Sequence, residues 1–114
     1  ATFATHGFPS DGSPLKAFYD DCTKRSFKVQ NIFFGLGGEA VDVIKTAAEA
    51  AKSFEPAKIN AAIREIKGMK GIVTDSVTYK DQNGTPLKEM VIIQVKDGAF
   101  TPIKKVTPAW VAKP

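Results

Sequence analysis

The sequence has few of the side chains that most often carry catalysis or bind metals. Its 114 residues include one cysteine, Cys22, and one histidine, His6. A single cysteine excludes an internal disulfide, and a zinc-type site would need further His or Cys ligands that the chain does not have. We therefore expect no metal, no cofactor and no catalytic set. His6 is interpreted as a loop histidine and Cys22 as a small core residue.

Arginine and long apolar runs are also scarce. The chain has 16 basic and 12 acidic residues, a net charge of +4, and its arginines are Arg25 and Arg64. Nucleic-acid binders commonly cluster basic residues on one face and favour arginine. The lysines here are spread along the chain, so we expect a solvated surface and no nucleic-acid partner.

No apolar run approaches the roughly 20 residues of a membrane-spanning helix. The length and composition fit one small globular domain.

The pattern of apolar residues predicts three helices. Ser13 is a typical N-cap before a helix over 14–24 that begins with proline. An alanine-rich stretch with apolar residues every three or four positions predicts a long helix over 38–52. Pro56 is expected to begin a third helix, over 56–68, which ends at a glycine.

Strands are expected at the two ends of the chain. The segment 2–5 alternates weakly, and the C-terminal part is rich in β-branched residues and turn dipeptides. The expected strands are 72–79, 89–96 and 100–106, with hairpin turns at Asn83-Gly84 and Asp97-Gly98.

The stretch "FFGLGGEAV" (33–41) holds three glycines within four positions, directly before the expected long helix. A dinucleotide loop requires G-x-G-x-x-G and a P-loop requires G-K-[ST], and neither pattern is present. Glu39, expected in the first helical turn, would repel an anion there but suits the positive end of the helix dipole. We interpret the glycines as a loop that permits a tight turn and close packing.

No other pattern indicates an enzyme. Asp20 and Asp21 are adjacent, and side chains in adjacent helical positions point in different directions, so they cannot act as one carboxylate pair. The residues alone predict a small α+β domain without visible catalytic machinery.

Several patterns in order resemble one family. "PLKAFYDDCTKRS" is similar to its helix that ends in a basic run, "GLGGEAVDVIKTAAEAAKS" to a helix that opens G-Y-D-A, and "VTYKDQNGTPLKEMVIIQVKDGAF" to its C-terminal strands. The stretch from Gly37 to Phe100 resembles the C-terminal third of type I periplasmic solute-binding proteins, the branched-chain-amino-acid class of ABC-transporter receptors, and with the first motif the resemblance covers nearly the whole chain. It departs from the family at Gly38, where tyrosine is usual, and at Glu39, where aspartate is usual.

The resemblance implies an α/β fragment of a two-lobed type I periplasmic-binding-protein fold. It places about 1–86 in the later part of the N-terminal lobe, about 87–107 in a crossover and C-terminal hairpin, and 108–114 in a tail. Members of the family are about three times longer, and the chain begins without Met, so we expect it to be a piece of a longer product.

The resemblance also implies a function without catalysis. The complete receptor would capture an amino acid or similar small polar solute and present it to the membrane permease of an ABC transporter. It would act in the periplasm or outside the cell, with a lipid anchor as an open alternative.

The expected ligand-binding residues are Thr5, His6 and Phe8, where the chain leaves a crossover strand. Gly37, Gly38 and Glu39 would form a hinge or cleft-rim loop.

A second hypothesis remains open. The chain would then be a small α+β protein-interaction or assembly domain with no small-molecule ligand. In either case uncovered apolar helix faces and strand edges favour association, so the isolated piece is a candidate homo-oligomer.

Overall fold

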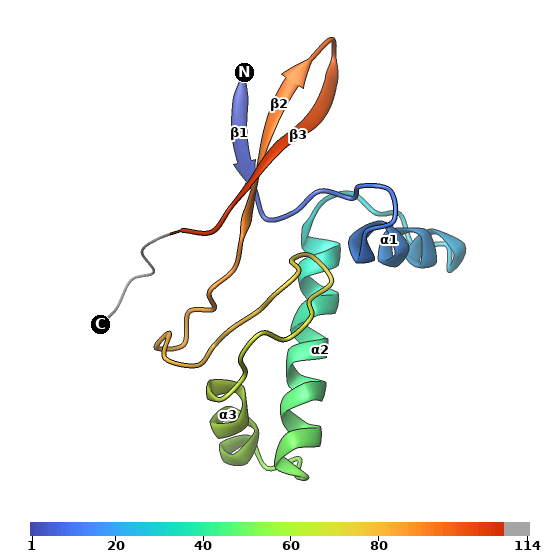
Figure 1. The fold of residues 1–114 in the computed structure, drawn as a ribbon. Helices are drawn as coiled ribbons and strands as arrows, with labels where there is room; N and C mark the ends of the chain where they lie inside the picture. The colour runs from blue at the N-terminus through green and yellow to red at the C-terminus, as the bar shows by residue number, and fades with distance from the viewer. Residues whose placement is uncertain (109–114) are drawn as a thin grey trace.

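The computed structural model describes residues 1–108, so most of the expected tail at 108–114 lies outside the described residues. Helices occupy one side of the molecule and a three-stranded sheet the other (Figure 1). The elements are β1 (Thr2–Thr5), α1 (Pro14–Lys24), α2 (Phe33–Ala51), α3 (Pro56–Arg64), β2 (Met90–Lys96) and β3 (Ala99–Val106). The mixed α/β character and most of the expected elements are confirmed.

The helices begin where local chemistry favours it. The Oγ of Ser13 accepts a hydrogen bond from the amide of Lys16 at 3.1 Å, which caps α1. Helix α2 begins at Phe33, whose amide donates to the Oδ1 of Asn31 at 3.0 Å. Pro56 begins α3, but that helix ends at Arg64, before the expected Gly68.

The core of the helical part lies between α2 and α3, which run side by side (Figure 1). Val43 and Ala47 of α2 pack with Ile66, and all three are buried. The alanines of α2 have no long side chain, which allows α3 to lie close. Helix α1 contacts α2 through a separate set of residues, among which Leu15 is 1% exposed.

The sheet has the order β1-β2-β3, and both of its pairings are antiparallel. Asp97 and Gly98 form the β2–β3 turn with positive φ at both residues, as this turn requires. The pairing register shifts between Ile92 and Ile93 beside Pro102, which cannot donate a ladder hydrogen bond and lies on the edge strand.

The prediction of a strand over 72–79 is wrong. This stretch makes only isolated bridges, from Val77 to Met69 and from Thr78 to Leu87. The amides of Val73 and Thr74 instead donate to the side chain of Glu39 in α2. Because the Glu39 carboxylate accepts from these two amides, they do not pair with a neighbouring strand.

The prediction that the glycines form a loop before the helix is also wrong. Helix α2 begins five residues earlier than expected, so Gly35, Gly37 and Gly38 are helical. A Cβ at Gly35 would lie 2.5 Å from a methyl group of Leu15 and 2.9 Å from one of Val73. Close packing, which the sequence did predict, therefore explains Gly35, and it does so inside the helix.

Candidate functional site

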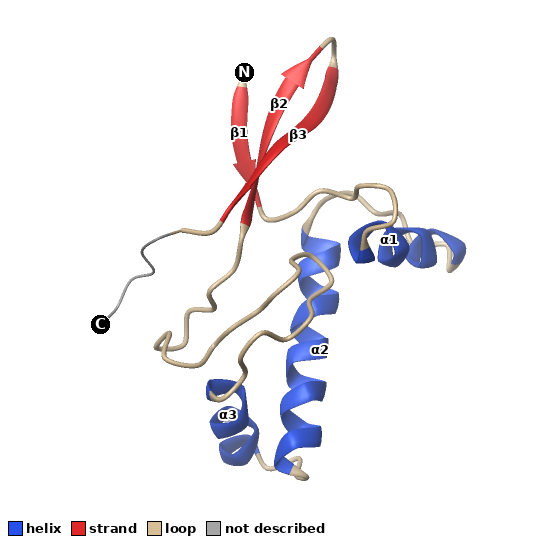
Figure 2. Cartoon of the chain, viewed as in Figure 1, coloured by secondary structure: helices blue, strands red, loops and turns tan. Residues whose placement is uncertain are grey.

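Two stretches connect the sheet to the helices, drawn as tan loops in Figure 2. Residues 6–13 lead from β1 to α1, and residues 65–89 lead from α3 to β2. No Cα atom of a described helix lies within 8 Å of a Cα atom of a described strand. We call the region between the two parts the junction; loop residues lie there together with side chains from α1 and from the strands. Phe8 lines two of the hollows that lie there.

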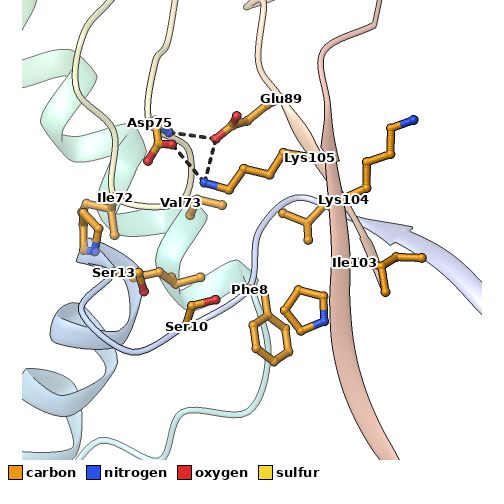
Figure 3. A pocket seen from close by; sticks show the side chains of 14 residues that line it. Phe8, Ser10, Ser13, Ile72, Val73, Asp75, Glu89, Ile103, Lys104 and Lys105 are labelled. Carbon is orange, nitrogen blue, oxygen red and sulfur yellow. Dashed lines mark hydrogen bonds and ion pairs between the residues drawn. The ribbon is translucent and has the colours of Figure 1, made fainter. Parts of the chain in front are cut away.

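The first hollow, the junction pocket, has a volume of about 310 Å³. Figure 3 shows Phe8, Ser10 and Ser13 along one side and strand β3 with Ile103, Lys104 and Lys105 along the other. Its wall also includes Ile72, Val73, Asp75 and Glu89. Residues far apart in the sequence thus meet here because both connections pass through the junction.

A charged cluster borders this pocket (Figure 3). The Nζ of Lys105 donates to Asp75 Oδ2 at 2.9 Å and lies 3.6 Å from Glu89 Oε1, which also accepts from the amide of Asp75 at 3.3 Å. The hydrogen bond from Lys105 lowers the pKa of Asp75, and the same bond raises the pKa of Lys105. Asp75 and Lys105 are more than half exposed, so water screens the pair and its energy is small. Such a cluster can exchange partners with a charged solute.

The second hollow, the sheet-side hollow, has a volume of about 570 Å³. Its sheet wall is apolar, made by Phe3, Ile93 and Phe100, with the rings of Phe3 and Phe100 5.5 Å apart in an edge-to-face arrangement. The helical side contributes Tyr19 and residues 29–32. This mixture of an apolar wall with a few polar groups is typical of small-molecule sites.

The polar groups of the sheet-side hollow come from three places. Thr5 lies at the end of β1, Gln30 and Asn31 lie before α2, and Tyr19 lies on α1. The Oη of Tyr19 donates to the carbonyl of Asn31 at 3.3 Å, which ties α1 to the residues that begin α2. Hydroxyl and amide groups of this kind can hydrogen-bond both ends of a zwitterion.

The structure brings together two of the three residues expected to bind ligand. Thr5 and Phe8 both line the sheet-side hollow, whereas His6 is exposed and lines neither hollow. Gly37 and Gly38 also line neither of them, and both lie within α2 rather than in a hinge or cleft-rim loop. Gly38 instead leaves room for the ring of Phe18.

Glu39 has a role that sequence reasoning missed. It was expected in the first turn of the helix, but α2 begins six residues before it, so the helix-dipole interpretation is wrong. The residue is 3% exposed, and its carboxylate accepts hydrogen bonds from the amides of Val73 and Thr74 and pairs with Lys88. These partners are 34, 35 and 49 residues away, so no local pattern could have indicated them.

Residues 1–108 lack two other kinds of feature. Within this range, no group of three or more His, Cys, Asp or Glu side chains is arranged to hold a metal ion. None of the helices in the same range has the length and apolar character needed to cross a bilayer.

Comparisons with known proteins give one informative match. No protein-family model matches the chain, and no curated protein does. Among solved structures, it is similar to the crystal structure of a leucine-binding protein, LivK, from Thermotoga maritima, with 27% sequence identity and a TM-score of 0.73. The alignment covers 94% of this chain and 31% of that one, so the chain spans about a third of the length of the protein it matches. The expected fold, a fragment of the two-lobed binding-protein fold, is confirmed.

Proposed function

We propose that the chain is part of a type I substrate-binding receptor that captures an amino acid or a similar small polar solute. The observation that carries the proposal is the structural match to a leucine-binding protein over 94% of the chain. The arrangement of the chain also supports the proposal. The chain crosses twice between the helical part and the sheet, and hollows lie beside these crossings. The expected division places about 1–86 in one lobe and about 87–107 in a crossing to the other, but β1 pairs with β2 in one sheet, so in this proposal β1 belongs with 87–107 and the helices belong to the other lobe.

The sheet-side hollow is the proposed site for the solute. Thr5 would contribute its hydroxyl and Phe8 its ring, and the apolar sheet wall would contact the solute's side chain. His6 would approach the solute only from the rim of the hollow, because its side chain is exposed. The proposed reaction is binding alone, with no bond made or broken, and the bound form would be delivered to an ABC-transporter permease outside the cytoplasm.

The test is thermal unfolding against a panel of L-amino acids and small carboxylates. The chain should be measured, and with it any longer natural product that contains it. A solute present at a hundred times its dissociation constant stabilises the folded state by about 2.7 kcal/mol, which corresponds to several degrees in Tm. A shift with one chemical class supports the proposal. No shift across the panel, from protein shown by circular dichroism to be folded, would contradict it.

The second candidate is a protein-interaction domain, and a specific observation favours it. Val41 and Ile44 on α2 are 64% and 53% exposed, and Phe54 beyond its end is 91% exposed. Apolar side chains gathered in this way mark surfaces that other proteins cover. A concentration-dependent oligomer that forms through this face, combined with no response to any solute, would favour this candidate.

A further inference from the structure

We infer that Glu39 is a positioning residue that latches the start of strand β2 to helix α2 and thereby holds the sheet in place relative to the helices. The inference goes beyond the proposed function and does not depend on it, because it concerns how the two parts of the chain are joined.

The helical part and the sheet have few direct ties. Over residues 1–108, helices lie against helices and strands against strands, and no helix Cα comes within 8 Å of a strand Cα. The sheet is joined to the helices through the loops of the junction, to which Lys105 of β3 adds exposed ion pairs with Asp75 and Glu89. A bond across the junction therefore has more influence on the relative placement of the parts than the same bond inside either part.

The carboxylate of Glu39 contacts two separate segments of the chain. Glu39 projects from the middle of α2, and its side chain is 4% exposed. Its Oε1 accepts from the amides of Val73 at 2.9 Å and Thr74 at 3.3 Å, while its Oε2 pairs with the Nζ of Lys88. Lys88 lies two residues before β2 begins. One side chain of α2 therefore holds both the loop 72–75 and the segment that enters the sheet.

Gly71 and Lys88 enclose the carboxylate of Glu39 and leave little room beside it. Gly71 is buried against it, and a Cβ at Gly71 would overlap with Glu39 Oε1 and lie 2.5 Å from the carbonyl oxygen of Thr74. Lys88 is 20% exposed at its side chain, so the pair is largely shielded from water. Removing one partner of a shielded ion pair leaves the other charge buried without a counter-charge, which is strongly destabilising. Removing one partner of an exposed pair has little effect, because water solvates the remaining charge.

The residues that Glu39 holds are close to the junction pocket. Val73 lines the junction pocket, as does Glu89, the residue after Lys88. Glu39 itself lines neither the junction pocket nor the sheet-side hollow. It therefore acts through the residues that it holds, from behind two walls of the junction pocket.

The decisive experiment measures the placement of the sheet directly. Spin labels at the native Cys22 on α1 and at Lys96→Cys at the end of β2 report the distance between the two parts. Glu39→Gln and Lys88→Met should each broaden or shift the distance distribution relative to the protein with Glu39 and Lys88 intact. The matched control is Glu49→Gln on the same helix, which removes an exposed ion pair with Lys45 at 3.5 Å and should leave the distribution unchanged.

Amide hydrogen exchange adds a second readout. Glu39→Ala removes the acceptor of the Val73 and Thr74 amides, so these two should exchange about tenfold faster or more. Amides of the α2–α3 core, such as that of Ala47, should keep their protection both in Glu39→Ala and in Glu39→Gln. An effect confined to the junction is what a positioning role predicts and general destabilisation does not.

Several results would overturn the inference. The distance distribution could stay unchanged in both Glu39→Gln and Lys88→Met, or Glu49→Gln could broaden it equally. Loss of core protection in both variants would also overturn it, because the pair would then serve folding of the whole chain rather than placement of the sheet.

Discussion

Alanine in place of two glycines of α2 should change stability in opposite directions. Gly37 is exposed, and a Cβ there would meet nothing within 4 Å. Alanine is favoured over glycine inside a helix, so Gly37→Ala should stabilise the fold by about 0.5–1 kcal/mol. Helix propensity favours alanine over glycine at position 35 as well, but the surroundings of Gly35 leave no room for a methyl group.

The loss at Gly35 can be worked from its contacts. The added Cβ would lie 2.5 Å from Leu15 Cδ1 and 2.9 Å from Val73 Cγ2. Leu15 is 1% exposed, so it cannot move aside without disturbing the contact between α1 and α2. Overpacking of this kind costs about 1–3 kcal/mol, which exceeds the helix-propensity gain. We expect Gly35→Ala to destabilise the fold by about 1 kcal/mol net.

Urea unfolding followed by circular dichroism would measure both changes, with an unchanged m-value as the sign that only stability moved. The Leu15→Ala background supplies a control, because it removes the nearer obstructing methyl group, that of Leu15, and leaves the one of Val73. Gly35→Ala should cost less in that background than in the unsubstituted chain. The reasoning would be refuted by a neutral or destabilising Gly37→Ala, which would place Gly37 outside the helix. Equal stability of the two variants would refute it too.

Three further substitutions test separate features of the structure. Because its bond with Lys105 lowers the pKa of Asp75 below 3.8, that carboxylate should contribute to stability above pH 3.8 and lose its contribution as the pH falls through the lower folded-state value. Asp75→Asn should remove this part of the pH dependence in urea unfolding compared between about pH 5 and about pH 2. Gly71→Ala should destabilise by about 1–3 kcal/mol in chemical denaturation, because its Cβ would displace the Glu39 carboxylate; an effect as favourable as that of Gly37→Ala would contradict this. Ser13→Ala should cost about 0.5–2 kcal/mol of thermal stability by removing the cap of α1, whereas Ser10→Ala, which removes no cap, should be near neutral.

The parts of the fold that the sequence predicted correctly depend on local chemistry. Ser13 beside a proline marks the start of α1 whatever the rest of the chain does, and the structure confirms it. Asp97-Gly98 fixes a two-residue turn through its positive φ values, and β2 and β3 follow from that turn.

The errors have a common cause in distant contacts. Glycine disfavours a helix locally, so the sequence predicts a loop before residue 38. Helix α2 nevertheless includes 33–37, with Gly35 at the point where Leu15 and Val73 approach. The stretch 72–79 has the composition of a strand, yet two of its amides are taken by Glu39. Both outcomes are decided by residues that are close only after folding.

The candidate site could be predicted in part for the same reason. Thr5 and Phe8 were expected from the resemblance, and both line the sheet-side hollow. The opposite wall, formed by Tyr19 and residues 29–32, comes from segments whose approach to the sheet no local pattern indicates.

The measurement that tests the central claim most directly is calorimetric titration of the most stabilising amino acid into two variants. Thr5→Val removes a hydroxyl from the proposed solute site. Thr2→Val makes the same change in the same strand, at an exposed residue that lines neither hollow. The account predicts weaker binding by about tenfold in Thr5→Val and unchanged binding in Thr2→Val. Equal affinity in both variants, or no heat of binding from any folded form of the protein, would contradict it.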